Sequence, residues 1–509
     1  MRLLAVVILI LFQVGLVFGQ TSLKEINLEN GDYALGFKHY RAFDSTRTYQ
    51  RIFDWNNKST PRPIPISVWY PADNPPEKTK AMSISDYMEI LKEEEEWEYL
   101  PNDQILNWFY YPNSEANQNH LKERVTAQYG VKPAKGKFPV VVYAPSYQAS
   151  SIENFALCEY LASHGYVVIS SPSRGTENRF FEGGTPKDLE TQARDIEFLI
   201  KEVHKLPYAE MNQMATMGFS FGGLSNVLSQ MRNKNIKAIV SLDGSIKYQF
   251  DTLKKSPFFN MDKVDVPFIH MAQKNIPEQV LVEDKIDPEL NSKFEFYDSL
   301  TNSKAYQLKF HNLTHSYFTT LGVLFQPRDQ RQDKKDSEIM ESYGLVSLYT
   351  LKFLNAFLKN DPSATKFLNN EPSQNGIARD LLDYQTKEPQ EGVFGFNDFN
   401  ERAAKQNYKD LHALYESILK EHPSLELPEG KLNNLGLQLV FNPKTSAYGI
   451  DVFLLATTLY PNSSNLYDSL AEAYLFLGDT DNAIVSFQKS LELNPQSQNA
   501  IDRLKQLRN

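Results

Sequence analysis

Short apolar segments alternate with helical segments through the middle of this chain, and this alternation limits the fold more than any other feature. One strand is predicted at 138–145, "FPVVVYAP", and the next at 166–170, "YVVIS". Between them, residues 150–165 carry apolar side chains at helical spacing and end on a glycine. Repeated strand–helix–strand units of this length predict a doubly wound α/β fold, in which helices cover both faces of a mostly parallel sheet.

The same pattern continues toward the C-terminus. A helix is predicted to begin at Thr185-Pro186, where a capping residue precedes a first-turn proline. Three further strands are predicted at 236–243, 266–272 and 305–310. One earlier strand is expected at 63–72, so residues 73–137 form an insertion between it and the alternating region. The α/β domain is therefore predicted to span 20–370.

A Gly-x-Ser-x-Gly motif, Gly218-Phe219-Ser220-Phe221-Gly222, follows a short apolar run and precedes a helical pattern. Between a strand and a helix, the glycines permit a sharp turn that exposes the serine hydroxyl above the sheet. The start of the helix also directs backbone N–H groups at developing negative charge. Ser220 is therefore predicted to be a nucleophile, and the alternative is a glycine-rich structural turn.

A serine nucleophile needs a base, and the base needs an acid that orients it. In this fold the acid and the histidine follow the serine in that order along the chain. Asp243 ends the next predicted strand, and Gly244 permits a turn there. The following strand ends instead in Gln273 and Asn275. Asp243 is therefore the predicted acid, and the alternative is an aspartate that only ends a strand.

Two histidines follow the last predicted strand, in "KFHNLTHSYF". His315 is the predicted base, because it lies farther from the strand end and can reach over Ser220. His311 is the alternative. His270 lies within a predicted strand and is expected to be a core residue, as is Cys158, the only cysteine.

These segments resemble the platelet-activating-factor acetylhydrolases, within the dienelactone-hydrolase-like group of α/β-hydrolases. The resemblance covers about 61–368. It rests on "LASHGYVVIS" with the Ser173-Arg174 pair beyond it, on "QARDIEFLI", on the interval from Ser220 to Asp243, and on "THSYF" in place of His-x-x-Phe. It implies a serine esterase that acts on short acyl esters of lipids.

The chain departs from this family at its oxyanion strand. "YAPSYQAS" has Pro145 and Ser146 where the family usually has His-Gly. By position, the backbone N–H groups of Tyr147 and Phe221 would form the oxyanion hole. The resemblance does not identify the ester substrate. The alternatives are a carbohydrate acetyl esterase, a thioesterase, or an inactive hydrolase fold that serves as a protein-interaction module.

The N-terminus predicts a secretory signal peptide at 1–19, with one arginine, an apolar run and small residues before Gln20. The protein is therefore expected to be secreted or periplasmic. The alternative is a retained anchor, which needs about 20 apolar residues.

The insertion at 73–137 contains four glutamates, Glu93 to Glu96, that are expected on a solvated helix face. It also carries six clustered aromatic residues, which either pack on the core or form a lid over the acyl pocket: Trp97, Tyr99, Trp108, Phe109, Tyr110 and Tyr111.

Composition changes near the C-terminus, where 371–400 is predicted to be a linker. Residues 401–509 resemble a tetratricopeptide repeat domain, because Pro461 and Pro495 lie 34 residues apart and the motif positions recur. Those in the second copy are Tyr467, Leu470, Ala471, Tyr474, Ala483 and Phe487. This smaller all-α domain is expected to bind a protein partner.

Charge narrows the remaining function classes. The formal net charge of −10 argues against a nucleic-acid surface, which needs clustered lysine and arginine. No cluster of residues with metal-ligand spacing and no phosphate-binding glycine loop is apparent, so neither a metal nor a cofactor is predicted.

Overall fold

The computed structural model describes residues 22–52, 58–73, 81–284, 286–327, 333–389 and 394–507. The chain divides into two compact units, 1–389 and 390–509. The predicted signal peptide at 1–19 lies outside the described residues, so export stays a prediction from sequence.

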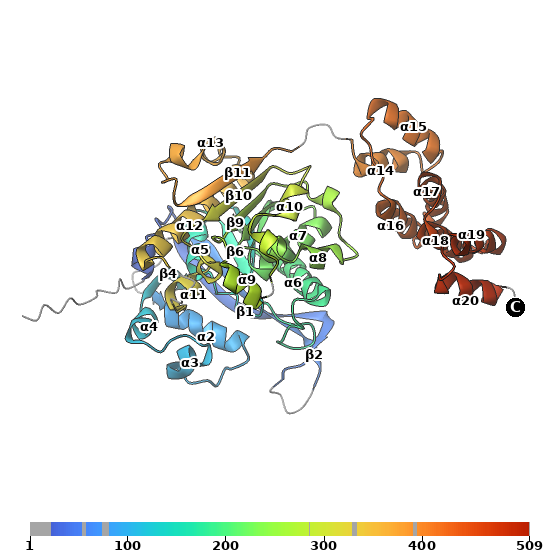
Figure 1. Cartoon of the computed structure of the whole chain (residues 1–509). Coiled ribbons are helices and arrows are strands. Elements are labelled where there is room, and N and C mark those ends of the chain that lie inside the picture. The colour runs from blue at the N-terminus through green and yellow to red at the C-terminus, as the bar shows by residue number, and fades with distance from the viewer. Residues whose placement is uncertain are drawn as a thin grey trace, which may run out of the picture. The chain divides into compact units, whose positions relative to one another are not determined.

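The first unit is built on one large sheet (Figure 1). Its 11 strands lie in the order β11-β10-β9-β8-β7-β5-β6-β2-β1-β4-β3. The run from β10 to β6 is parallel throughout. All six of these strands match segments predicted from the sequence, which confirms the α/β fold class. They are β5 (Phe138–Ala144), β6 (Val167–Ser170), β7 (Ala209–Phe219), β8 (Ile236–Leu242), β9 (Phe268–Ala272) and β10 (Ala305–Phe310).

The N-terminal side of the sheet contains strands that the sequence analysis missed. β2 (Thr60–Ala72) was expected, and it pairs antiparallel with β6 and with β1 (Ala34–Tyr49). β1 in turn pairs with β4 (Arg124–Tyr129), which pairs with β3 (Ala81–Ser83). β1 gave no strand signal because much of it is exposed and polar. β3 and β4 both lie in the insertion at 73–137, which therefore contributes two strands to the sheet.

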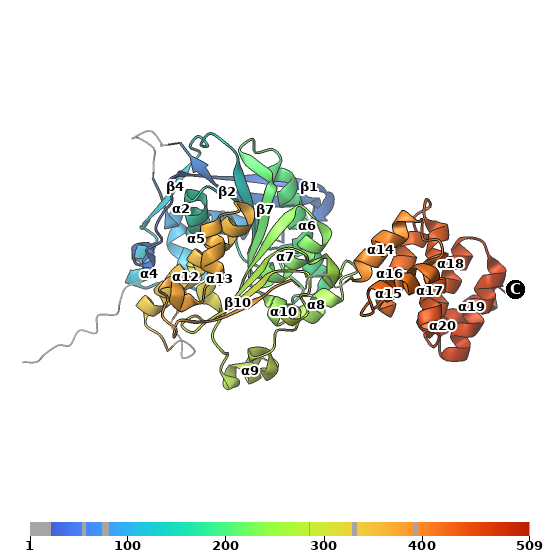
Figure 2. The same ribbon diagram turned by 90° about the horizontal axis from the view of Figure 1, so that it is seen from above.

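Helices cover both faces of the sheet (Figure 2). On one face, α5 (Phe155–Ser163) and α12 (Asp336–Leu358) pack in a core with the side chains of Val141 and Val240. On the other, α6 (Pro186–Val203) and α7 (Phe221–Arg232) pack in a second core. Thr185 caps α6 as predicted, and Cys158 is fully buried in α5.

Shorter elements complete this unit. The α-helices are α1 (Leu23–Ile26), α2 (Ile84–Glu94), α3 (Ile105–Trp108), α4 (Glu115–His120), α8 (Phe250–Lys254), α9 (Glu278–Asp284), α10 (Glu295–Asp298), α11 (Thr320–Phe325) and α13 (Pro362–Asn369). The 3-10 helices are η1 (Asn102–Gln104), η2 (Ser245–Lys247), η3 (Met261–Lys263), η4 (Pro288–Asn291), η5 (His315–Phe318) and η6 (Pro372–Asn375).

Of the four glutamates, Glu93 has a partly exposed side chain, and the predicted solvated face is wrong for the other three. Glu94 is fully buried and Glu96 is 6% exposed. Glu94 accepts hydrogen bonds from Ser150 and Ser151, and Glu96 accepts one from the Tyr49 hydroxyl. A run of glutamates predicts solvent exposure only when no hydrogen-bond donors from distant segments contact it. Here such donors come from other elements, so the carboxylates can be buried.

The six clustered aromatic residues of the insertion divide into two groups. Trp97 packs edge-on against Trp108, and Tyr111 packs against Phe325 of α11. Phe109 also lies against the core. In contrast, Tyr99 is 99% exposed and Tyr110 is 91% exposed, so these two rings cover no apolar surface.

The predicted linker at 371–400 is shorter in the structure. β11 (Leu382–Lys387) occupies part of it and pairs antiparallel with β10 at the edge of the sheet. The boundary between the two units falls at 389/390 instead of 370. Most of its side chains are exposed or half-buried, so its polar composition, "LDYQTK", was indistinguishable from that of a loop.

The second unit is helical. Its helices are α14 (Phe396–Lys405), α15 (Leu411–Glu421), α16 (Glu429–Val440), α17 (Ser446–Leu459), α18 (Ser464–Phe476), α19 (Thr480–Leu493) and α20 (Gln498–Leu507). Gly436 of α16 meets the ring of Phe453, where a Cβ would come within 2.7 Å of a ring carbon. Tyr408, Leu411 and Ile418 are buried within this unit, and Leu504 of α20 packs against α18 and α19.

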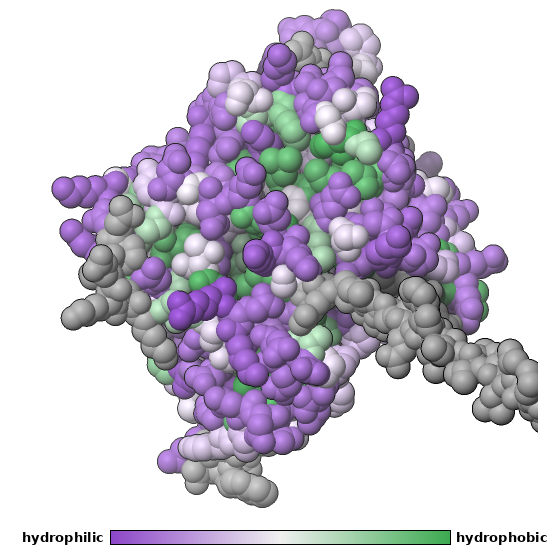
Figure 3. All heavy atoms as spheres, turned by 90° about the vertical axis from the view of Figure 1, so that its left-hand side faces the viewer, coloured by the Kyte–Doolittle hydropathy of each residue, from purple (hydrophilic) through white to green (hydrophobic). Residues whose placement is uncertain are grey.

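One face of the molecule is mainly hydrophilic, with apolar side chains gathered in limited areas (Figure 3). Within the described ranges, no helix combines the length and the apolar character needed to cross a bilayer.

Candidate active site

Ser220 lies at the turn between β7 and α7, with φ 51° and ψ −120°. This left-handed backbone is strained for a residue with a side chain. Glycines make the turn feasible: a Cβ on Gly218 would come within 2.5 Å of the Asn226 side chain, and one on Gly222 within 2.0 Å of the Ala144 carbonyl. The sequence analysis predicted this sharp turn.

The side chain of Ser220 begins a chain of hydrogen bonds that contains all three predicted residues. Ser220 Oγ lies 3.0 Å from His315 Nε2, and His315 Nδ1 lies 2.6 Å from Asp243 Oδ2. The structure thus brings together residues separated by up to 95 positions in the sequence. A serine, an imidazole and a carboxylate in this order can activate a hydroxyl for attack on a carbonyl.

Asp243 follows β8 directly and is fully buried. Its backbone is left-handed, with φ 39°, and its amide donates to the Met271 carbonyl. Its second oxygen, Oδ1, accepts a hydrogen bond from the backbone N–H of Gln273 at 3.0 Å. The end of β9, which carries no acid, therefore supplies a donor that orients the carboxylate.

His315 begins η5, in the loop after β10, and its side chain is 44% exposed. Its ring stacks at a tilt on Phe219, with the centroids 4.8 Å apart. The alternative, His311, points elsewhere: its Nδ1 contacts the Asp380 carbonyl and its Nε2 lies 3.2 Å from Asp383. The structure places His315, and not His311, on Ser220.

Of the two predicted oxyanion amides, that of Phe221 directly follows Ser220 and that of Tyr147 lies in the loop after β5. Phe221 N is the first amide of α7, and Tyr147 packs its ring against Phe221. The neighbouring amide of Ser146 is already engaged, because it donates to Glu153 Oε1 at 2.7 Å. Within the described residues neither Tyr147 N nor Phe221 N has an intramolecular acceptor, so neither amide is already engaged.

Two buried glutamates hold the loop that carries Tyr147, and the sequence analysis missed both. Glu153 accepts from Ser146 N and Oγ and from the Tyr143 hydroxyl. Glu94 accepts from Ser150 and Ser151 at the other end of the loop. Burial raises the pKa of each carboxyl group to about 7, against the lowering effect of these hydrogen bonds. Nothing in the local sequence identifies these contacts.

His270 is a buried core residue, as predicted. It is fully enclosed in β9, and its Nδ1 lies 2.9 Å from Ser241 Oγ. Burial lowers the pKa of the imidazole to about 3, so it is neutral at physiological pH.

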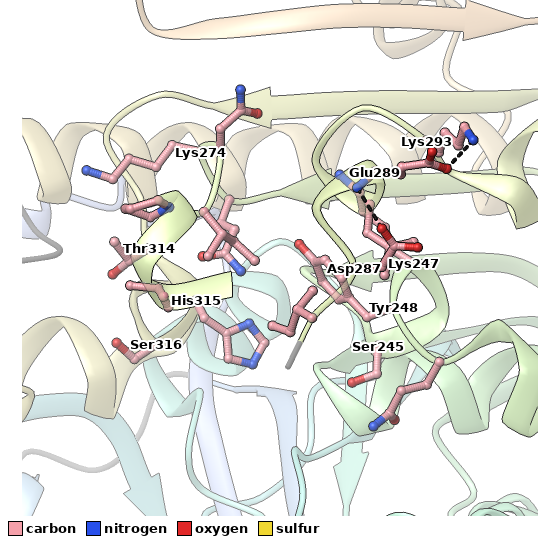
Figure 4. A pocket seen from close by; sticks show the side chains of 18 of the residues that line it. Ser245, Lys247, Tyr248, Lys274, Asp287, Glu289, Lys293, Thr314, His315 and Ser316 are labelled. Atoms are coloured by element: carbon pink, nitrogen blue, oxygen red, sulfur yellow. Dashed lines mark hydrogen bonds and ion pairs between the residues drawn. The ribbon is translucent and has the colours of Figure 1, made fainter. Parts of the chain in front are cut away.

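A cavity of about 1020 Å³ opens beside His315 and is lined only by residues from 245–327 (Figure 4). Figure 4 shows the imidazole of His315 projecting into it, with Ser245, Lys247 and Tyr248 across from it. The clustered aromatic residues of 73–137 contribute no side chain to its wall. Its volume suits a ligand of small-molecule size.

The described part of the chain contains no group of three or more histidine, cysteine or acidic side chains arranged to hold a metal ion.

Comparisons with known proteins agree with this architecture in parts of the chain. Residues 124–264 match the family model described as X-Pro dipeptidyl-peptidase (S15 family), and 464–497 match that of the tetratricopeptide repeat. A search of curated proteins finds no significant match. Among solved structures, a ferulic acid esterase from Streptomyces cinnamoneus is similar, with 19% identity and a TM-score of 0.49 over 69% of this chain and 96% of that one.

Proposed function

We propose that the first unit is a serine hydrolase that cleaves carboxylic esters with Ser220 as nucleophile, His315 as base and Asp243 as the orienting acid. The observation that carries this proposal is the 3.0 Å contact between Ser220 Oγ and His315 Nε2 at a strained strand-to-helix turn. Strained backbone at such a turn is stabilised by the surrounding structure and is typical of functional sites.

In the first half of the reaction, His315 Nε2 takes the proton of Ser220 as Oγ attacks the ester carbonyl. Asp243 stabilises the imidazolium through Nδ1–H. The N–H groups of Phe221 and Tyr147 donate to the oxygen of the tetrahedral intermediate. The imidazolium then gives its proton to the departing alcohol, and an acyl group remains on Ser220.

In the second half, water replaces the alcohol. His315 takes a proton from the water as its oxygen attacks the acyl carbonyl, and the same oxyanion donors bind the second intermediate. Collapse releases the carboxylic acid, and the proton returns to Ser220. One ester bond and one water molecule are consumed in each cycle.

We propose short acyl esters, including those of lipids, as the substrate class, on the strength of the sequence resemblance to platelet-activating-factor acetylhydrolases. Carbohydrate acetyl esters and thioesters are the competing substrates for the same residues. The helical unit would bind a protein partner, since tetratricopeptide repeats are interaction modules. With the predicted signal peptide, the enzyme would act outside the cytoplasm.

The family-model match over 124–264 favours a second candidate, release of X-Pro dipeptides from the amino terminus of a peptide. A peptidase of that kind must recognise the charged amino terminus of its substrate, which calls for free carboxylates near the nucleophile. Each acidic side chain that lines the cavity beside His315 has a partner among the described residues. This arrangement favours ester hydrolysis over dipeptide release.

The decisive experiment compares wild type with Ser220→Ala. Wild type should hydrolyse p-nitrophenyl acetate and react with a fluorophosphonate probe, whereas Ser220→Ala should lose the labelling and roughly four to six orders of magnitude of kcat. Circular dichroism would check that the variant folds. Retention of most of the activity in Ser220→Ala would refute the mechanism, and faster turnover of an X-Pro p-nitroanilide than of any ester would favour the peptidase.

A further inference from the structure

The cavity beside His315 contains a buried lysine that the proposed reaction does not use. Lys247 is only 6% exposed and ends η2, the short helix that follows Asp243. The first residue of η2, Ser245, donates its amide to the Ser220 carbonyl at 2.8 Å. The position of Lys247 is therefore fixed relative to the nucleophile.

Lys247 differs from the other lysines on the cavity wall. Lys274 pairs with Asp333, and Lys293 pairs with Glu289. Among the described residues, the ammonium of Lys247 has no hydrogen-bond acceptor and no carboxylate within ion-pair distance, and it lies 5.7 Å from the centre of the Tyr248 ring. The stem of Lys247 is thus buried, while its ammonium lines the open cavity with no acceptor from the protein.

The acidic residues of the wall do not compensate for this charge. Asp251 and Glu295 are exposed at the rim, where both pair with Lys254. Asp287 caps η4. Burial lowers the pKa of Lys247 and Asp243 opposes this electrostatically, yet Asp243 is engaged with His315. An anion that enters the cavity is thus the partner that Lys247 lacks.

We propose that Lys247 forms an anion subsite of the substrate cavity, and that the ester cleaved at Ser220 carries a carboxylate or phosphate group that pairs with this ammonium. The inference rests on the proposed esterase function and adds a specificity determinant to it. The charged group of the substrate would be the acceptor that the Lys247 ammonium lacks in the protein, and it would orient the ester carbonyl toward Ser220.

The test uses the full-length chain and matched esters. p-Nitrophenyl hydrogen glutarate and p-nitrophenyl pentanoate compare a charged with a neutral acyl side, while 4-acetoxybenzoate, 4-acetoxyphenyl phosphate and phenyl acetate compare charged with neutral alcohol sides. The quantity measured is the ratio of kcat/KM for the charged ester to that for its neutral match. Dividing the wild-type ratio by that of the variant cancels differences in intrinsic reactivity.

Lys247→Met should lower this ratio about 10-fold or more on one side of the ester, mainly through KM, because a buried charge pair is lost. Lys247→Arg should restore much of it. The side and the anion that respond distinguish an acyl carboxylate from a carboxylate or phosphate on the alcohol. Lys293→Met is the matched control, since that lysine already pairs with Glu289, and it should keep the wild-type ratio.

Two results would overturn the proposal. An equal loss on charged and neutral esters would mean that Lys247 acts through Asp243, and an unchanged ratio in every pair would mean that no anion binds there. Failure of the esterase function gives a different result, because the wild-type protein would then hydrolyse none of the esters and Ser220 would not be labelled.

Discussion

Each residue of the proposed triad has a geometry that its neighbours in space impose. Ser220 takes a left-handed backbone because glycines on both sides let β5 and α7 approach. Asp243 is oriented by the Gln273 amide, which belongs to another strand. His315 can contact Ser220 and a substrate because the loop after β10 leaves its side chain partly exposed. The three residues thus depend on contacts that are distant in sequence.

The histidine assignment can be tested by substitution. His315→Ala should reduce kcat on p-nitrophenyl acetate about as much as Ser220→Ala, because the base and the nucleophile act as a unit. The double variant should be little worse than either single variant. His311→Ala should retain most of the activity, since that ring faces Asp383 and the Asp380 carbonyl. A severe defect in His311→Ala alone would show that the base is His311, four residues before His315.

At the scale of elements, buried carboxylates join the insertion at 73–137 to the hydrolase core. Glu159 of α5 accepts from the Tyr87 hydroxyl of α2 at 2.7 Å, and from the amides of Thr126 and Ala127 in β4. Glu94 connects the end of α2 to the loop that carries Tyr147. The insertion therefore belongs to the framework that holds the proposed oxyanion hole.

This arrangement predicts a pH dependence of stability. Burial raises the pKa of Glu159 from its ordinary value of 4.5 to about 7, so the folded protein binds a proton more tightly than the unfolded chain. The resulting stabilisation is complete below pH 4.5 and is lost as the pH rises through 7. Glu159→Gln should make the decline in the free energy of unfolding between pH 5 and pH 8 smaller, by up to about 3 kcal/mol.

Urea unfolding at pH 5, 6, 7 and 8 measures this difference. Glu177→Gln is a suitable control, because that side chain is 76% exposed and should leave the slope unchanged. An identical slope in wild type and Glu159→Gln would show that the carboxyl group titrates in the folded protein as it does in the unfolded chain.

For the whole molecule, the boundary at 389/390 separates the proposed chemistry from the repeat unit. The proposed catalytic residues all lie before it, and β11 belongs with them. The Leu381 carbonyl accepts the amide of His311, at the start of the loop that carries His315. A cut before β11 would therefore remove support from that loop and expose the edge of β10.

Two truncations should consequently behave differently. Residues 1–389 should hydrolyse p-nitrophenyl acetate with kcat/KM close to that of the full chain. Residues 1–370 should unfold at lower temperature and lose turnover, because β10 loses its antiparallel partner. Activity assays and thermal unfolding of both products check this. A 1–389 protein that is folded and monomeric yet inactive would show that the repeat unit helps to form the active site.

The amino-acid sequence alone predicts the α/β order, the sharp turn at Ser220 and the candidates for acid and base. Those features are local: strand and helix periodicity, glycine spacing and chain order can all be read within short windows. The same holds for the repeats, whose marker positions recur along the chain.

The folded chain was needed to show which histidine meets Ser220, that Glu94 and Glu153 are buried, that β1 and β11 join the sheet, and that Lys247 faces the cavity. Each of these depends on partners that fold in from distant segments. Burial and hydrogen bonding are properties of the assembled environment, so a glutamate run or an isolated lysine has the same local signature whether it is solvated or enclosed.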